Sequence, residues 1–428
     1  MFSRQSFVAL RHRNYRLLWI GLFVSFSGSM MQNAGLLWHV SLLVPPDRKG
    51  LALGMVGLVR VMPIMVFSMI SGVVADAWDR RRLMLFTQIA ATIVATILAL
   101  LTFRGLSHVW PLYVLAALGS AVGAFDLPAR GALVPTLVPR EHLPNAISLN
   151  TIMFQTASVV GPSLGGLMIA SAGVGWVYVA NAISFGFVIV ALLMMRDVPP
   201  HPVSEAGKRD EVSIHAAMEG LRFVFRSPLI RSTMLLDFFA TFFSSATALL
   251  PIFAQDILRV GAKGYGWLYA APAVGAMATS AALVPLVDRI DSRGRVLLWS
   301  VAAYGLSTVL FGVSPWFWLS FVCLMLTGAT DTVSMVIRNI VRQLETPDRL
   351  RGRMMGVNMV FFMGGPQLGE LEAGAVANWF GAVISVVSGG VGCLIATGWI
   401  AAATPALRQY RRGVADPTEE TVGQRIRT

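Results

Sequence analysis

The sequence of 428 residues contains little charge, because Asp, Glu, Lys and Arg together make up only 13% of it. Soluble domains carry about 25%. Hydrophobic residues make up 55%, and the mean hydropathy is +0.67. So few charges cannot solvate the surface of a water-soluble chain of this size. The composition excludes a disordered chain and a water-soluble enzyme, and it predicts a protein embedded in a lipid bilayer.

Groups that bind metals or nucleotides are also scarce. The two cysteines, Cys323 and Cys393, lie in apolar stretches, which excludes a disulfide framework. The six histidines are scattered, and no GxxxxGK[ST] phosphate loop occurs. We therefore expect no metal, no cofactor and no enzymatic activity. A membrane-embedded enzyme would need a catalytic constellation, and a sensor would need a soluble output domain.

Long apolar stretches are abundant, and twelve of them reach the roughly 20 residues that a membrane-spanning helix needs. They lie near residues 15–40, 51–75, 83–103, 109–128, 145–171, 175–195, 229–253, 264–287, 296–313, 316–338, 354–375 and 380–402. The first follows a basic N-terminus but is too long for a signal peptide, so we interpret it as a membrane helix. The prediction is an all-α integral membrane protein with 12 transmembrane helices in two pseudo-symmetric six-helix bundles. The expected units are residues 1–196, a cytoplasmic linker at 197–228, residues 229–404, and a cytoplasmic tail at 405–428.

The basic residues are distributed unevenly along this pattern. If the N-terminus is cytoplasmic, the outer loops hold only Arg48, Lys49, Arg104, Arg259 and Lys263. Apart from these and one arginine inside the second stretch, the basic residues fall on or beside the cytoplasmic side. Such asymmetry predicts cytoplasmic N- and C-termini. It also explains the net charge of +12 without a nucleic-acid partner.

The two halves repeat each other. "GVVADAWDRRRLML" after the second stretch recurs as "VPLVDRIDSRGRVL" after the eighth, with Asp76 matching Asp288 at a spacing of 212 residues. Arg130 matches Arg338 at a spacing of 208, and "GPSLGG" in the fifth stretch recurs as "GPQLGE" in the eleventh. This order and spacing indicate a duplicated six-helix unit, an arrangement found in secondary transporters.

These motifs resemble the major facilitator superfamily. The loop "GVVADAWDRRR" is similar to its signature between helices two and three, and "GPSLGG" is similar to the motif of its proton-coupled exporters, although Ala157 replaces a usual glycine. The segments "FDLPARGALVPTLVPREHLPNAISLN", "LLPIFAQDILRVGAKGYGWLYAAPAVGA" and "TPDRLRGRMMGV" resemble the enterobactin-exporter-like branch, the transmembrane secretion effectors.

The resemblance implies a monomeric, proton-coupled exporter of the bacterial inner membrane. It would move a small molecule, a siderophore or a drug-like amphipath, by alternating access and with the proton gradient as its energy source. A lysophospholipid flippase and an uptake symporter of the same fold are the alternatives.

The resemblance also implies a cytoplasmic gate in the loops between helices. We expect Asp76 to pair with Arg130 and to hold the cytoplasmic side closed when the protein faces outward, with Asp288 and Arg338 as the second pair. The gate residues are Gly72, Asp76, Asp79, Arg80, Arg81, Arg82, Arg130, Asp288 and Arg338. A basic anchor that only fixes the topology is the simpler interpretation.

The glycine motif in the fifth stretch comprises Gly161, Pro162, Gly165 and Gly166. Small residues let helices approach closely, and proline permits a bend. We expect this surface to pack against the eighth stretch, which contains "APAVGAMATSAA", and to seal the interface between the halves.

Charged residues inside apolar stretches are the strongest functional signal, since a charge at a helix centre costs at least about 2.5–3.5 kcal/mol. Asp237 is our candidate for proton binding, with a structural hydrogen bond as the alternative. Arg60 is expected to reach either Glu370 or Glu372, in a coupling role or as a static ion pair. These two glutamates lie two positions apart and cannot share a helix face.

Polar residues in apolar surroundings complete the candidates. Gln32, Asn33 and Gln155 either line a substrate cavity or form hydrogen bonds between helices. Asp126 and Asp331 precede Arg130 and Arg338 by four and seven residues, and pairing along the helix surface is expected for both.

Overall fold

The structure is a computed structural model that describes residues 7–196, 221–347 and 350–411. Within these ranges the chain forms helices and no strands, and the predicted all-α membrane fold is confirmed. The first half contains α1 (Arg13–Leu43), α2 (Lys49–Ala77), α3 (Arg80–Phe103), α4 (Trp110–Leu133), α5 (Leu143–Ala172) and α6 (Val174–Met194). The second contains α8 (Pro228–Phe243), α9 (Leu250–Ile252), α10 (Gly261–Leu283), α11 (Arg293–Val313), α12 (Phe317–Glu345), α13 (Arg351–Phe380), α14 (Ala382–Ala403) and α15 (Pro405–Gln409).

In the described part of the chain, nine helices are long and apolar enough to cross a membrane. The total of twelve spans stays a prediction. Local sequence explains several helix ends. Helices α4, α5 and α8 have proline in their first turn, where a backbone N–H would have no acceptor within the helix, so its absence costs no hydrogen bond. Gly173 after α5 and Gly381 after α13 both have positive φ, 92° and 91°, a conformation that favours glycine. These two glycines are 208 residues apart, the spacing of the sequence repeat.

The apolar stretch predicted near 229–253 corresponds to a span at Pro228–Ile257, but its helix is interrupted. Helix α8 ends at Phe243, and the chain continues through a 3-10 turn (Ala246–Leu249), α9 and a π turn (Phe253–Ile257). Serine hydroxyls compete with helical N–H groups for backbone carbonyls, which weakens a helix at that point. Here the Ser245 hydroxyl donates to the Thr241 carbonyl at 2.7 Å. Pro251 lacks the N–H that would continue the ladder.

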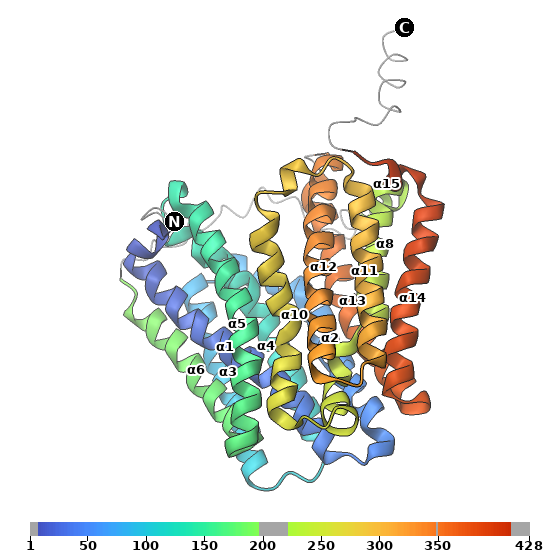
Figure 1. The fold of residues 1–428 in the computed structure, drawn as a ribbon. Helices are drawn as coiled ribbons and strands as arrows, with labels where there is room; N and C mark the ends of the chain where they lie inside the picture. Colours follow the sequence, from blue (N-terminus) through green and yellow to red (C-terminus); the bar gives the residue numbers. More distant parts are fainter. Residues whose placement is uncertain (1–6, 197–220, 348–349, 412–428) are drawn as a thin grey trace.

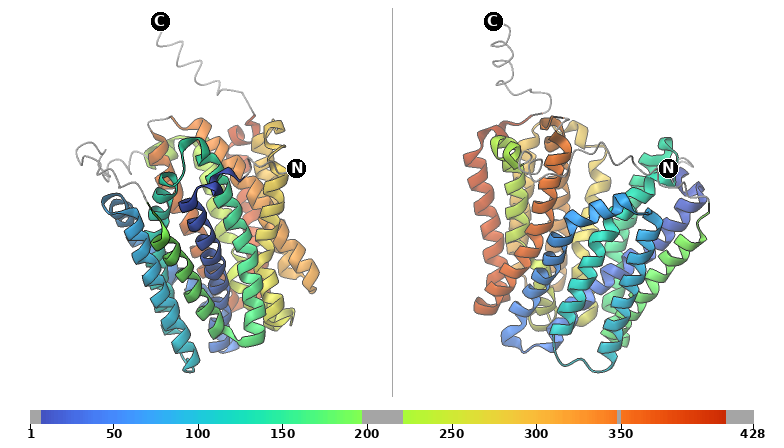
Figure 2. Two further views of the ribbon diagram at one scale, coloured as in Figure 1. Left: turned by 90° about the vertical axis from the view of Figure 1, so that its left-hand side faces the viewer. Right: turned by 180° about the vertical axis from the view of Figure 1, so that it is seen from behind.

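The helices form two groups, α1–α6 and α8–α14, that diverge toward one end of the molecule (Figures 1 and 2). Helix α1 begins and α15 lies at this end (Figure 1). We call it the cytoplasmic end, following the predicted orientation, and the opposite one the outer end. Toward the outer end the groups meet, α2 against α13 and α5 against α10. A buried apolar cluster joins the two groups there, with Ala34 and Trp38 of α1 packed among residues of α10 and α13.

Candidate functional site

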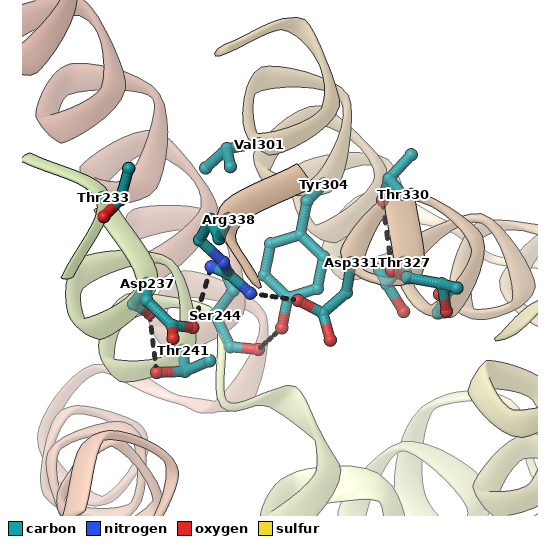
Figure 3. A network of polar contacts seen from close by, with 12 residues as sticks. Thr233, Asp237, Thr241, Ser244, Val301, Tyr304, Thr327, Thr330, Asp331 and Arg338 are labelled. Atoms are coloured by element: carbon teal, nitrogen blue, oxygen red, sulfur yellow. Dashed lines mark hydrogen bonds and ion pairs between the residues drawn. The ribbon is translucent and has the colours of Figure 1, made fainter. Parts of the chain in front are cut away.

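A buried ion-pair cluster occupies the second group of helices. Asp237 of α8 lies between two arginines of α12, with Oδ1 2.7 Å from Nη1 of Arg338 and Oδ2 3.2 Å from Nη2 of Arg342. All three side chains are buried. Arg342 also donates to the amide oxygen of Asn358 on α13. The cluster therefore ties together α8, α12 and α13. Figure 3 shows Asp237 and Arg338 facing each other.

The cluster continues toward the middle of α12. Nη2 of Arg338 lies 3.4 Å from Oδ1 of Asp331, whose side chain is 45% exposed. Beside it, the Tyr304 hydroxyl donates to the Ser244 carbonyl at 3.5 Å, where the seventh span is broken (Figure 3). A cavity of about 120 Å³ adjoins Asp331, Tyr304 and Ser244.

These contacts bear on three expectations. The expected pairing of Arg338 with Asp331 is confirmed, and Arg338 also pairs with Asp237. The expected pair of Arg338 with Asp288 stays a prediction, because the Asp288 side chain lies outside the described residues. Asp237 was expected to bind a proton, yet two guanidinium groups already neutralise its charge in this conformation. Sequence reasoning missed Arg342. Its signal was its position four residues after Arg338, which places both on one helix face.

The first group of helices has a smaller counterpart. Asp126 and Arg130 form an ion pair within α4, as their four-residue spacing indicated. Thr87 and Gln88 of α3 each donate to Oδ1 of Asp126 at 2.8 Å. Arg130 also lies over the ring of Phe26, 4.2 Å from its centroid. Asp126 is its ion-pair partner among the described side chains.

The predicted gate loop binds helix ends. The Asp76 side chain and the surroundings of Gly72 lie outside the described part of the structure, so the gate pair stays a prediction. Asp79 caps α3 by accepting the N–H of Arg82 at 2.8 Å. Arg80 donates to the Ala132 carbonyl at the end of α4, and Arg81 donates to the Leu192 carbonyl at the end of α6. Cations at helix C-termini complement the helix dipole, so this loop fastens the cytoplasmic end of the first group.

A polar cavity of about 260 Å³ lies inside the first group. Gln32, Asn33 and Arg60 line it together with Asn181, whereas Gln155 does not. Arg60 donates to the Asn33 side chain at 3.3 Å, and Asn181 donates to Gln32 at 2.8 Å. The lining contains one guanidinium group and no carboxylate, which suits an electron-rich polar ligand.

Arg60 forms no direct ion pair with a glutamate among the described side chains, but its charge acts on Glu370 across the interface between α2 and α13. Arg60 bonds to Asn33, and Glu370 and Glu372 form no ion pair with the described side chains. Glu370 packs against α2 one turn away, where a Cβ added at Gly57 would lie 2.9 Å from its Oε2. This Oε2 is buried and has no hydrogen-bond partner. Such a group deserves a functional explanation.

The glycine motif of α5 packs on two sides. A Cβ added at Gly161 would lie 2.4 Å from the Ser27 carbonyl of α1, and one at Gly165 would lie 2.8 Å from Met31. Toward α10, one at Gly166 would lie 2.8 Å from the Cα of Gly266, which itself faces Pro162. The expected contact with the eighth span exists, but it lies at Ala262 and Gly266, nearer the outer end than the predicted stretch.

Polar contacts at the outer end also join the two groups. Nζ of Lys49 on α2 lies 3.0 Å from Oδ2 of Asp256 in the π turn. Gln255 donates to the Ser41 hydroxyl at 2.7 Å, and Tyr265 donates to the Ala34 carbonyl at 2.8 Å. Together with the glycine contacts they hold this end closed. No local pattern in the sequence indicates these pairs, because the two residues of each pair lie more than 200 residues apart.

Comparison with known proteins agrees with this architecture. The sequence profile of the family described as "transmembrane secretion effector" matches residues 4–422. The enterobactin exporters EntS of Escherichia coli O1:K1 and Shigella boydii serotype 18 are each 28% identical over 344 residues, which cover 80% of this chain and 81% of theirs.

Solved transporter structures share the fold. A bacterial homologue of the human lysosomal transporter Spinster, inward-facing and unoccupied, superposes with a TM-score of 0.71 at 15% identity, covering 94% of this chain and 99% of that one. A POT family transporter in complex with 5-aminolevulinic acid gives 0.71 at 13% identity, covering 92% and 96%. The resemblance to the major facilitator superfamily is confirmed.

Proposed function

The chain belongs to the transmembrane secretion effector family of the major facilitator superfamily, and from this premise we propose that it is a proton-coupled exporter working by alternating access. It is a multi-pass membrane protein, which we place in the bacterial inner membrane with both termini in the cytoplasm. The proton gradient supplies the energy, and a monomer suffices because each chain contains both halves of the transport unit.

One observation carries the proposal: the two groups of helices are held together at the outer end and diverge at the other (Figure 2). This is the arrangement expected of a transporter that has closed its outer side and accepts cargo from the cytoplasm. Closure rests on glycine contacts and a few polar pairs, which can separate without unfolding a helix.

The cargo that fits best is a small polar or amphipathic molecule, with a siderophore as the first choice. The relatives named enterobactin exporters suggest this class. In support, the polar cavity offers the guanidinium of Arg60 and the amides of Asn33 and Asn181 to electron-rich oxygens. The alternative directions, uptake or lipid flipping, predict different transport assays.

The test uses inside-out membrane vesicles that contain the protein, with radiolabelled enterobactin as the probe. We expect accumulation when the vesicle interior is acidified, and loss of accumulation when a protonophore collapses the gradient. Accumulation that ignores the gradient contradicts proton coupling. Transport in the opposite direction identifies an uptake symporter, and flipping of fluorescent lysophospholipid without enterobactin transport identifies a flippase.

A further inference from the structure

An open groove lies between α11 and α14 at their cytoplasmic ends, apart from the residues discussed above. It has a volume of about 550 Å³, and its wall consists mainly of apolar and small residues, among them Leu298, Trp299, Leu394 and Gly398. Both helices are apolar enough to cross a membrane. The groove therefore opens on the hydrocarbon layer, where its natural occupant is an acyl chain.

Two arginines stand at the mouth of this groove. Arg295 projects from the first turn of α11, and Arg408 lies on α15. Both are exposed, and within the described part of the chain neither guanidinium group has a hydrogen-bond or ion-pair partner. The groove lining contains no carboxylate that would neutralise them.

Arg408 is held in place by its neighbours on α15. The N–H of Gly294 on α11 donates to the Tyr410 carbonyl at 3.1 Å, and Leu407 is fully buried. A Cβ added at Gly294 would lie 1.6 Å from the Leu407 carbonyl oxygen, so only glycine permits this approach. The Tyr410 hydroxyl donates to Glu345 at 2.8 Å. Because α15 is fixed on α11, the two arginines form a preformed cationic pair.

From this arrangement we propose that the groove binds an anionic phospholipid of the cytoplasmic leaflet, with its phosphate between Arg295 and Arg408 and one acyl chain along α11 and α14. The two positive charges lie at the ends of membrane-spanning helices, the depth at which headgroups lie. Basic pockets between spans on the cytoplasmic side recognise anionic headgroups in this way. The proposal does not depend on the cargo or the direction of transport.

The test measures the binding of single lipids to the detergent-purified, full-length protein by native mass spectrometry. The probes are phosphatidylglycerol and phosphatidylcholine with identical acyl chains. Each basic residue near the surface contributes a factor of about 5. We therefore expect the double variant R295A/R408A to bind phosphatidylglycerol about 30-fold more weakly and phosphatidylcholine unchanged. Arg140→Ala, an exposed arginine on the same end of the first group, is the matched control.

A second variant tests the acyl chain without touching charge. A Cβ added at Gly398 meets no atom within 4 Å, so Gly398→Leu folds and fills the groove; Gly186→Leu on α6 is equally unhindered and serves as control. We expect only Gly398→Leu to weaken binding of the first phosphatidylglycerol. The proposal is overturned if R295A/R408A binds this lipid like the wild type, if Arg140→Ala weakens it equally, or if glycerol phosphate alone displaces it, which would indicate a site for free phosphate.

Discussion

The carboxylate of Asp237 on α8 and the guanidinium of Arg338 on α12 lie 2.7 Å apart in the buried interior of the second helix group. Arg342 contacts the same carboxylate from one turn further along α12. A buried charge is tolerated only when it is paired, so removing one of the three residues leaves an uncompensated charge between the two helices.

Replacing Asp237 with Asn removes the carboxylate shared by two buried arginines, which leaves Arg338 only Asp331 and Arg342 only the neutral Asn358 side chain. Breaking a buried ion pair costs about 3–5 kcal/mol. We expect a clearly lower thermal unfolding midpoint in detergent, measured by size-exclusion fluorescence. Asp331→Asn, whose side chain is 45% exposed, should change the midpoint much less. The variant D237N/R338M should recover part of the loss. If the double variant still transports cargo in response to the proton gradient, Asp237 does not carry the proton. If Asp237→Asn unfolds at the same midpoint as the wild type, the structural role of Asp237 is contradicted.

Glu370 is the better candidate for proton coupling, because its buried Oε2 has no partner, whereas two arginines neutralise Asp237. Glu370→Gln keeps the shape of the side chain but cannot release a proton. We expect exchange of cargo across the membrane to continue while accumulation driven by the proton gradient is lost, as measured in proteoliposomes. Glu372→Gln is the matched control. Unchanged accumulation over the whole pH range in Glu370→Gln would exclude this glutamate.

Lys49 and Asp256 should act as an outer gate pair. The Asp256 side chain is about half exposed, so the ion pair stabilises the closed form by at most about 1 kcal/mol. Lys49→Met should therefore shift the equilibrium between the closed and the open outer end only about fivefold toward the open form. The measurement is the yield of cross-linking by a short bifunctional maleimide between cysteines placed at Ser41 and Gln255, whose side chains touch in the closed form. The native cysteines are buried and interfere little. The exchanged pair K49D/D256K should restore the yield; an unchanged yield in Lys49→Met would contradict the gate.

The glycine contact between α5 and α10 should be required for closure. A Cβ at Gly166 would lie 2.5 Å from the Ala262 carbonyl oxygen, so Gly166→Leu forces the two helices apart. We expect transport to fall at least about tenfold, because the larger side chain prevents the outer end from closing. Cysteines introduced at the outer end should also become more reactive toward a membrane-impermeant maleimide. Gly131→Leu, at an exposed glycine with open space, should transport normally. Normal transport by Gly166→Leu would exclude a tight seal here.

Several features of the fold could be predicted because they depend on residues close together in the sequence or on their chemical type. Apolar stretches identified the helical membrane fold, and the repeat identified two related halves. The pair Asp126–Arg130 followed from a four-residue spacing within one helix. The break after Phe243 could not be predicted, since the apolar stretch continues through it.

The sequence by itself determined that the protein lies in a lipid bilayer, that it is helical, and which family it belongs to. Hydropathy, helix periodicity and motif spacing are local properties of the chain, so they can be recognised without the tertiary structure. Only the tertiary structure decided the partners of those charged residues whose contacts lie on another helix. Arg60 forms a hydrogen bond with Asn33, while Arg338 forms an ion pair with Asp237 and Lys49 forms one with Asp256. The physical reason is that a long, flexible side chain in a low-dielectric interior takes whichever opposite charge or polar group the packing of neighbouring helices brings within about 3 Å. That packing depends on close glycine contacts between helices distant in the sequence, such as that of Gly166 with Gly266.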